Sequence, residues 1–356
     1  MSGTVLQLEN LLRLVEGFAG KRLAVLGDFV VDEFVQGDIA RVSREAPVLI
    51  LDYRGTSVVP GGGGNTVANL RALGADPRPV GVIGRDASGD RLLEAFEQLR
   101  VSTASILRER SYVTPAKSRI LAGGIHTRRQ QIVRLDRGQP GRVFSAALQQ
   151  RIARKLEKVA ARADGLVVAD YGYGSATPEI VGSLGKATGR KVTRSKVTGS
   201  RASAGKRELQ LTVDSRGRIL DYPGGAACTP NQEEVEIAVG SGTLHDDEAV
   251  RRAGARMLRR SGHAAVLMTR GAKGMCLFEP RKKPLTIPAF GSDEVADVTG
   301  AGDTVTAVFS LARAAGGSFA EAAALANVAA GLVVMKAGTA TISADEIRQA
   351  LLEEQP

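Results

Sequence analysis

Aspartate and glycine residues in the segment 297–303 form the pattern best able to support chemistry. The segment reads Asp-Val-Thr-Gly-Ala-Gly-Asp, and a helical pattern rich in alanine and valine follows it from about Thr304 to Ala315. Because Gly300 and Gly302 carry no Cβ atom, backbone N–H groups can approach an anion closely. The N-terminal end of the following helix would direct its positive dipole at the same place. The pattern therefore predicts a phosphate or oxyanion site.

Asp303 would lie directly beside that anion, where a carboxylate repels a bound phosphate. One purpose that explains its presence is to accept the proton of an attacking hydroxyl during phosphoryl transfer. The alternative is that Asp303 only caps the helix, because aspartate is a frequent N-cap residue. The local pattern does not decide between the two.

A second cluster holds four consecutive glycines at positions 61–64, between Pro60 and Asn65. A helical pattern follows and closes at Gly74. Glycines before a helix let a ligand approach the backbone, and the Asn65 amide offers a donor and an acceptor that suit sugar hydroxyls. A flexible loop without a ligand would have the same composition, so this cluster alone is weak evidence.

Three catalytic fingerprints are absent from the sequence. There is no G-x-x-x-x-G-K-[ST] loop and no G-x-S-x-G nucleophile elbow, and the first strand pattern ends at Gly27-Asp28 without G-x-G-x-x-G. These absences argue against a P-loop NTPase, an α/β-hydrolase and a dinucleotide-dependent dehydrogenase.

Three cations, Lys117, Arg119 and Arg134, fall on segments with the alternating polarity of strands. Lys117 and Arg119 are two positions apart, so they point to the same face of a strand. Because a guanidinium grips phosphate bidentately, these residues indicate a substrate that already carries a phosphate. The alternative is that they are solvated edge-strand charges that oppose aggregation.

Alternating strand and helix patterns must position these residues. Strand patterns occupy 23–26, 80–83, 165–169, 211–213 and 264–269, and helical patterns include 87–99, 145–160, 246–260 and 319–335. This alternation predicts an α/β fold whose central, mainly parallel sheet is covered by helices on both faces. Asp170 follows one of the strands, and ligands bind at the carboxyl ends of strands in such sheets.

Two stretches, at about 33–56 and 112–137, depart from this alternation. We expect them to form a small antiparallel sheet that acts as a lid beside the ligand cleft. A basic stretch with serines and glycines, at about 191–210, predicts a surface insertion. No internal repeat or proline-rich linker divides the chain, so we expect one domain over 1–356.

The composition narrows the classes of partner. Lysine and arginine number 48 against 38 aspartates and glutamates, for a net charge of +10, which suits an acidic small substrate. A nucleic-acid partner is not expected, because the arginines are dispersed and aromatic residues are few. No apolar run approaches the roughly 18 residues of a membrane span. The two cysteines are far apart and form no zinc motif. We expect a cytoplasmic protein.

The motifs DVTGAGDT at 297–304 and PGGGGN at 60–65 resemble the two signatures of the ribokinase-like (PfkB) carbohydrate kinases in type, order and spacing. The resemblance extends over about 21–347. It implies a ribokinase-like fold and an ATP-dependent carbohydrate kinase that uses Mg²⁺ and, in some members, K⁺.

Within that family, several stretches are most similar to the heptose-7-phosphate kinases. They are 26–48, 114–124, 130–137, 168–174 and 325–343. The similarity implies transfer of the ATP γ-phosphate to the anomeric hydroxyl of D-glycero-D-manno-heptose 7-phosphate. The product would be the 1,7-bisphosphate, on the route to ADP-heptose and lipopolysaccharide.

The resemblance also implies roles for single residues. It makes Asp303 the catalytic base and Gly300, Ala301 and Gly302 the anion hole. The predicted substrate-binding residues are Asp32, Gly62, Gly63 and Asn65, together with Lys117, Arg119, Arg134 and Asp170. The predicted nucleotide-binding residues are Asn231, Thr269, Gly271, Gly274 and Asn327. Glu234 would hold Mg²⁺ through water, and Asp297 and Thr299 would hold a monovalent cation. From the residues alone, Asn231 and Glu234 could equally form a capping box.

The sequence departs from the family pattern at two places besides the insertion. Tyr173 stands where a lysine is expected, and Ser215, in Asp-Ser-Arg-Gly, stands where a proline is typical. Bifunctional relatives carry a C-terminal nucleotidyltransferase domain with an HxGH-type motif, which is absent here, so we expect a kinase-only protein. The open edge of the lid predicts a homodimer formed by lid pairing. The alternatives are a kinase for another sugar or sugar phosphate and a non-catalytic basic binding protein.

Overall fold

The computed structural model describes residues 7–123, 129–187, 209–222, 227–291, 296–336 and 338–353, without the side chains of 185–187. The predicted insertion at about 191–210 lies outside the described residues, apart from Leu209 and Gln210.

The central sheet has nine strands in the described chain, in the order β13-β12-β11-β10-β9-β8-β1-β4-β5. The strands are β1 (Arg22–Gly27), β4 (Asp76–Gly84), β5 (Ile106–Glu109), β8 (Gly165–Asp170), β9 (Gln210–Ser215), β10 (Ala227–Cys228), β11 (Ala265–Thr269), β12 (Met275–Phe278) and β13 (Leu285–Ile287). All neighbours run parallel except at β12 and β13, which extend one edge with antiparallel pairings. The predicted, mainly parallel sheet is therefore confirmed.

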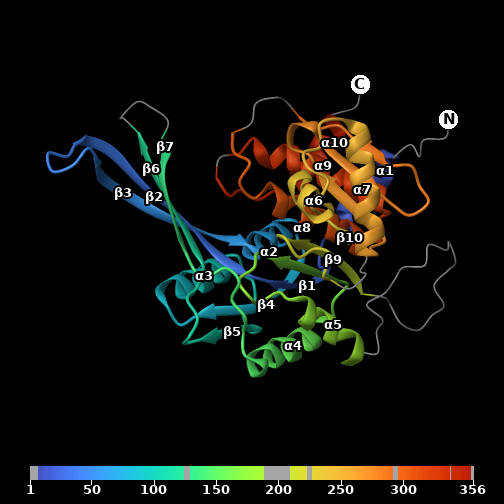
Figure 1. Cartoon of the computed structure of the whole chain (residues 1–356), viewed down its shortest axis with the longest axis horizontal. Coiled ribbons are helices and arrows are strands. Elements are labelled where there is room, and N and C mark those ends of the chain that lie inside the picture. The colour runs from blue at the N-terminus through green and yellow to red at the C-terminus, as the bar shows by residue number, and fades with distance from the viewer. Residues whose placement is uncertain are drawn as a thin grey trace.

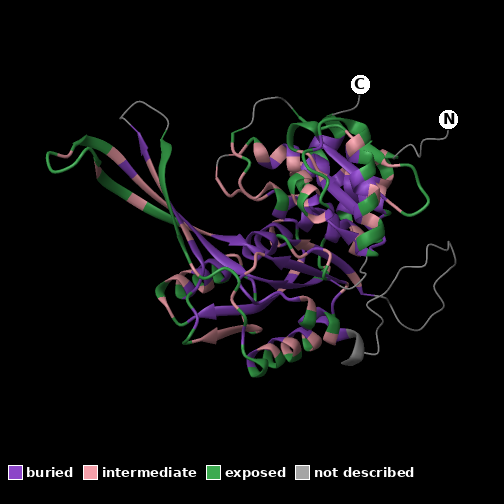
Figure 2. Cartoon of the chain, viewed as in Figure 1, coloured by how far each residue is buried: buried purple, intermediate pink, exposed green. Residues whose placement is uncertain are grey.

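Helices cover both faces of this sheet (Figure 1). One face packs against α1 (Leu8–Glu16), α2 (Gly63–Ala72), α3 (Ala87–Gln98), α8 (Ala301–Ala314), α9 (Phe319–Val334) and α10 (Ala344–Glu353). The other packs against α4 (Ala146–Ala160), α5 (Pro178–Ala187), α6 (Gln232–Val239) and α7 (Asp247–Ser261). In β1, Leu23 and Val25 belong to the first core and Ala24 and Leu26 to the second. Successive side chains of a strand point to opposite faces of the sheet, so a strand that is apolar at every position is buried on both faces. Figure 2 shows that the central strands are buried.

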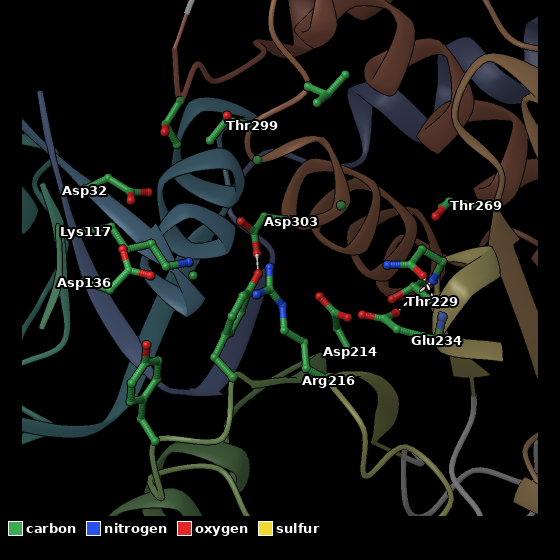
Figure 3. A pocket seen from close by; sticks show the side chains of 18 of the residues that line it. Asp32, Lys117, Asp136, Asp214, Arg216, Thr229, Glu234, Thr269, Thr299 and Asp303 are labelled. Atoms are coloured by element: carbon green, nitrogen blue, oxygen red, sulfur yellow. Dashed lines mark hydrogen bonds between the residues drawn. The ribbon is translucent and has the colours of Figure 1, made fainter. Parts of the chain in front are cut away.

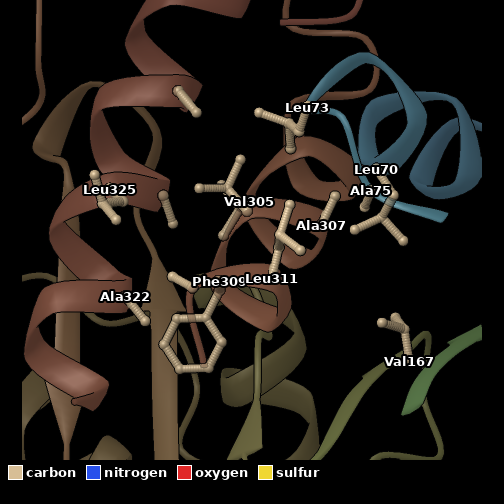
Figure 4. Packing of buried hydrophobic residues seen from close by; sticks show 14 of the residues in the cluster. Leu70, Leu73, Ala75, Val167, Val305, Ala307, Phe309, Leu311, Ala322 and Leu325 are labelled. Atoms are coloured by element: carbon tan, nitrogen blue, oxygen red, sulfur yellow. The ribbon is translucent and has the colours of Figure 1, made fainter. Parts of the chain in front are cut away.

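Helix α8 lies deep in the first core. Its residues from Asp303 to Ala312 are all buried, which is the expected place for a helix that is apolar nearly all round. Its neighbours in that core include Leu70 and Leu73 of α2 and its C-terminal turn, and Ala322 and Leu325 of α9 (Figure 4). This packing fixes the N-terminal end of α8, where the 297–303 motif lies.

A second sheet of four strands projects from the body (Figure 1). Its order is β3 (Leu49–Gly62), β2 (Phe29–Val42), β6 (Ala116–Gly123) and β7 (Gln130–Arg137). The expectation of a purely antiparallel lid was wrong, because β2 and β6 pair in parallel while the other two pairings are antiparallel. The chain returns through the body between β3 and β6, so these two segments of the lid do not form one meander.

Ion pairs connect the base of this lid to the body of the protein. The buried Glu33 of β2 accepts hydrogen bonds from Ser118 and from the guanidinium groups of Arg91 in α3 and Arg137 in β7. A carboxylate held by two arginines links both lid segments to α3.

In the part of the chain that the structure describes, no helix is long and apolar enough to cross a bilayer.

Candidate active site

The N-terminal end of α8 is shaped by Gly300. This residue is the N-cap and has a left-handed backbone with φ of +83°. A Cβ atom there would lie 2.4 Å from Nδ2 of Asn65, so only glycine fits. The helix starts at Ala301, three residues earlier than the pattern beginning at Thr304 predicted. Asp303 therefore lies inside the first turn and is not the N-cap residue.

Asp303 is buried and its carboxylate is held from two sides. Its Oδ2 accepts a hydrogen bond from Nδ2 of Asn65 at 3.0 Å, and its Oδ1 accepts one from the Tyr171 hydroxyl at 2.5 Å. Burial raises the pKa of the carboxyl to about 6, against the lowering effect of these two donors. A carboxylate with this pKa can accept a proton near neutral pH.

The glycine-rich segment at 61–64 meets this carboxylate from the other side. Gly62 has φ of +56° and precedes α2, whose first turn carries Asn65. Asn69 donates to the Asn65 side chain and accepts from Thr304 of α8 at 3.2 Å. The two motifs, distant in sequence, therefore meet through side chains at adjoining helix starts.

Loop 171–175, which follows β8, is ordered by the buried carboxylate of Asp28. That carboxylate accepts backbone N–H groups from Tyr171 at 3.0 Å, Tyr173 at 2.9 Å and Ser175 at 2.7 Å. Burial raises the pKa of Asp28 to about 6, although these three bonds favour the charged form. Tyr171 is thereby held in reach of Asp303.

Asp170, a predicted substrate-binding residue, has its hydrogen-bonding partners within the protein. Its buried carboxylate receives two hydrogen bonds from Arg218, one from Ser215 at 2.7 Å and one from Tyr222 at 2.9 Å. Asp170 does not line the cavity beside Asp303 in the described structure. It stands at a strand end as expected, but its oxygens join the ends of β8 and β9.

A cavity of about 480 Å³ opens beside Asp303 and brings most of the predicted residues together (Figure 3). Predicted residues that line it are Asp32, Gly62, Lys117, Arg119, Arg134, Asn231, Glu234, Thr269, Thr299, Gly300, Gly302 and Asp303. Lys117 and Asp32 lie on the lid side, and Glu234, Thr229 and Thr269 lie on the opposite side. The lid strands thus supply one wall of the cavity.

The cations of this cavity differ in how far they are neutralised. Arg119 forms a buried ion pair with Asp32 at 2.6 Å, and Arg134 contacts both oxygens of Asp136 at 2.9 Å. Within the described residues, neither Lys117 nor Arg216 forms an ion pair; both lie near the ring of Tyr171, at 5.9 Å and 4.7 Å from its centroid. Burial, and then the nearby Arg216, lower the pKa of Lys117. Arg216 acts at longer range on the nearby carboxylates, and its charge works to lower the pKa of Asp214 and Asp303 against the effect of burial.

Two carboxylates face the cavity on the other side of Asp303. Desolvation and the neighbouring Glu234 raise the pKa of Asp214 well above its usual range, and desolvation raises the pKa of Glu234. Glu234 and Asn231 also form the capping box that starts α6. The described residues include no cluster of three groups able to hold a metal. A pair of carboxylates does suit Mg²⁺, which keeps several waters and is completed by substrate phosphates.

A second cavity, of about 460 Å³, adjoins the first at Thr269, Val298 and Gly302. Predicted nucleotide-binding residues that line it are Thr269, Gly271, Gly274 and Asn327. Ala301, a residue of the predicted anion hole, lines it too. Most of the other lining residues are apolar, which suits a flat aromatic base. The Asn327 amide donates to the Pro288 carbonyl at 2.8 Å and fixes one wall.

Asp297 and Thr299 lie in the turn before α8. Oδ1 of Asp297 accepts the Thr299 N–H at 2.9 Å, and Oδ2 accepts the Gly338 N–H at 3.2 Å. The carboxylate therefore ties two loops together, and its role toward a monovalent cation stays a prediction.

Sequence reasoning did not single out Tyr171, Asp214 and Arg216, all of which line the main cavity. Tyr171 directly follows β8 and Arg216 directly follows β9, and Asp214 is the next-to-last residue of β9. All three therefore lie at the carboxyl ends of parallel strands, as Asp170 does, where ligands bind in open α/β sheets. The sequence does not indicate the direction in which each of these side chains points.

Comparison with known proteins gives a consistent result. A sequence model described as pfkB family carbohydrate kinase matches residues 197–346. The bifunctional protein HldE of Desulfatibacillum aliphaticivorans is 36% identical over 340 residues, which is 95% of this chain and 64% of that protein. The HldE of Gluconobacter oxydans is 34% identical over 345 residues, covering 96% and 67%. The chain thus spans slightly under two thirds of the first relative's length.

Solved structures share the fold. Phosphofructokinase-2 from Escherichia coli, in complex with substrates and products, superposes with a TM-score of 0.71 at 16% identity and covers 94% of this chain and 99% of that one. Ribokinase from Arabidopsis thaliana, complexed with ribose and ATP, gives 0.64 at 21% identity over 94% and 98%. These matches confirm the predicted ribokinase-like fold.

Proposed function

This chain belongs to the pfkB family of carbohydrate kinases, which makes it an ATP-dependent sugar kinase; on that premise we propose that its substrate is D-glycero-D-manno-heptose 7-phosphate. The product is the 1,7-bisphosphate, which precedes ADP-heptose on the route to lipopolysaccharide. The choice of heptose rests on the similarity of five segments to the heptose-7-phosphate kinases. The observation that supports the chemistry is the buried carboxylate of Asp303, which shares its cavity with Lys117 and Arg216. Neither cation forms an ion pair with another described residue.

Asp303 acts as the general base. It takes the proton of the anomeric hydroxyl while that oxygen attacks the γ-phosphorus of ATP, and ADP leaves on the opposite side. Backbone N–H groups of Gly300, Ala301 and Gly302, at the positive end of α8, stabilise the charge that develops on the transferred group.

Arg216 is placed to assist this transfer. It faces the cavity beside Asp303 and Asp214, and its guanidinium forms no ion pair in the described structure. We assign it to the phosphate that moves. When bound, a divalent cation neutralises charge on the ATP phosphates, and Asp214 and Glu234 are the residues that would hold it.

The lid supplies the grip on the phosphate already present on the substrate. Lys117 provides a positive charge that is not paired with a carboxylate of the described structure. Arg119 and Arg134 are each paired with a carboxylate, Asp32 and Asp136 respectively. A substrate phosphate competes with these carboxylates for the guanidinium groups, so the two arginines contribute after rearrangement. Asp32, released from Arg119, becomes available to sugar hydroxyls.

The nucleotide occupies the second cavity, with its base against the apolar wall near Asn327 and its phosphates toward Gly302. Because the donor is ATP, we propose that the protein works in the cytoplasm.

We also propose that two copies pair through their lids. The lid exposes the apolar side chains of Ile39, Val42, Leu49, Ile132 and Leu135. Among the described strands, β3 and β7 are its edges. An exposed apolar sheet with open edges is the kind of surface that a second strand or sheet covers. A single monomeric species in size-exclusion chromatography with light scattering would contradict this pairing.

The test of function is ADP release from MgATP with a panel of sugars and sugar 7-, 6- and 1-phosphates. Turnover with heptose 7-phosphate alone supports the proposal. Turnover with another sugar keeps the kinase and removes the heptose assignment. No turnover with any acceptor, together with salt-dependent retention on DNA, would favour a binding protein instead.

A further inference from the structure

We propose that Tyr171 is a positioning residue that occupies the acceptor hydroxyl's place on Asp303 when no sugar is bound, and so restrains transfer of phosphate to water. The inference rests on the proposed role of Asp303 as the base. It concerns a step that every kinase must control, because water is always available as a competing acceptor.

The geometry puts the phenol where an acceptor would stand. The Tyr171 hydroxyl lies 2.5 Å from Oδ1 of Asp303, and Asn65 holds the other oxygen, Oδ2, at 3.0 Å. Tyr171 lines the cavity, so its hydroxyl reaches the carboxylate from the substrate's side. An acceptor hydroxyl that is to give its proton to Oδ1 needs this same position.

The ring is held there by its surroundings. Backbone N–H bonds from the loop to Asp28 fix the main chain at Tyr171 and Tyr173. Lys117 lies 5.9 Å and Arg216 4.7 Å from the ring centroid, and cations at such distances favour an aromatic ring. Both cations are also proposed to bind phosphate. Ligand binding would therefore draw them away from the ring and weaken the contacts that keep the Tyr171 side chain in place.

The phenol is chemically inert at this place. Desolvation and the charge of Asp303 raise the pKa of Tyr171 well above its usual range, so it stays protonated and donates. In the productive complex the sugar hydroxyl replaces it: the hydroxyl proton passes to Oδ1, the sugar oxygen bonds to the γ-phosphorus, and the bond to ADP breaks. Water in that place would undergo the same transfer and yield inorganic phosphate.

The experiment compares wild type with Tyr171→Phe, which removes one oxygen and keeps the ring. We expect ATP hydrolysis without sugar to rise about tenfold relative to sugar phosphorylation, as for the loss of a hydrogen bond to a charged group. We also expect the acid limb of kcat/KM to move to higher pH, because the phenol's hydrogen bond lowers the pKa of Asp303. Adding Asp303→Asn should remove the extra hydrolysis.

Tyr112→Phe is the matched control. The Tyr112 hydroxyl bonds the Tyr173 carbonyl at 3.3 Å, so it supports the same loop without touching Asp303. If Tyr112→Phe reproduces both effects, or if Tyr171→Phe shows neither while its thermal unfolding and ATP affinity match wild type, the inference is wrong. If wild type phosphorylates no sugar at all, the proposed function fails instead, and the two failures remain distinct.

Discussion

The side-chain amide of Asn65 donates a hydrogen bond of 3.0 Å to Oδ2 of Asp303, across a separation of 238 residues in the chain. This bond joins the two glycine-rich segments. Gly300 leaves the space for the amide, since a Cβ atom there would collide with it. On the proposed mechanism, the pairing gives both motifs a part in one site: one would supply the base, and the other would orient it.

Substitution Asn65→Ala should therefore slow turnover more than it weakens ATP binding. Removing the donor leaves Oδ2 without its partner and raises the pKa of Asp303, because the Asn65 hydrogen bond lowers it. We expect kcat to fall about 10- to 100-fold, in line with a lost hydrogen bond to a charged group. Steady-state kinetics measure this, with Asn10→Ala in α1 as the control. An unchanged kcat would show that Asn65 does not orient the base.

The pH profile of the wild-type enzyme should report the base directly. The pKa of Asp303 is raised to about 6, so the carboxylate is charged above that pH and protonated below it. Activity should then be lost as pH falls through about 6, since a protonated carboxyl cannot accept the hydroxyl's proton. The measurement is kcat/KM between pH 5 and 8. A profile that stays flat across this range would contradict the assignment.

Arg216 should matter for the chemical step. We expect Arg216→Ala to lower kcat by about 10²- to 10³-fold, the usual loss when a charge that stabilises a transition state is removed. Arg216→Lys should retain part of the activity, because it keeps the charge without the planar fork. Pre-steady-state product formation separates this step from ADP release. Equal burst rates in wild type and Arg216→Ala would place Arg216 outside the chemistry.

Arg218, two residues further on, should act on stability instead. It holds the buried Asp170 through two hydrogen bonds, the shorter of 2.7 Å. Arg218→Ala leaves that carboxylate buried without its cationic partner, held only by the neutral donors of Gly172, Ser215 and Tyr222. We expect a loss of about 3 kcal/mol in the free energy of unfolding. Urea denaturation measures it. Arg252→Ala, which breaks an exposed pair with Glu248 in α7, should cost under about 0.5 kcal/mol. Similar losses of unfolding free energy in Arg218→Ala and Arg252→Ala would contradict the assignment of a stabilising role to the buried pair of Arg218 and Asp170.

Much of the fold could be predicted because the signals were local. The run Leu23–Leu26 is apolar at every position, and β1 proved to be buried on both faces. The start of α8 was misplaced by three residues because Gly300 and Gly302 weaken the helical pattern where the helix begins. The parallel pairing of β2 with β6 could not be read from either strand, since register and direction are set by contacts between distant segments.

The motifs of the candidate site could be predicted from the sequence, but the hydrogen-bond partners of its side chains could not. Asp303 and Asn65 stand in recognisable glycine-rich patterns, so both could be chosen as candidates from the sequence, and their side chains do meet in the structure. Nothing in the sequence indicates that Asp170 turns toward Arg218 and away from the cavity, or that Tyr171 turns toward Asp303. The direction of each side chain depends on which partner is within reach after folding. Adjacent residues can therefore point in opposite directions, as Asp170 and Tyr171 do.

The most direct test of the account is turnover of heptose 7-phosphate by Asp303→Asn. The substitution keeps the size of the side chain and removes its ability to take a proton. The account predicts that kcat falls by about 10³-fold or more, while ATP affinity, measured by calorimetry, stays within a few-fold of wild type. Turnover near the wild-type rate in Asp303→Asn would contradict the central claim that this carboxylate is the base.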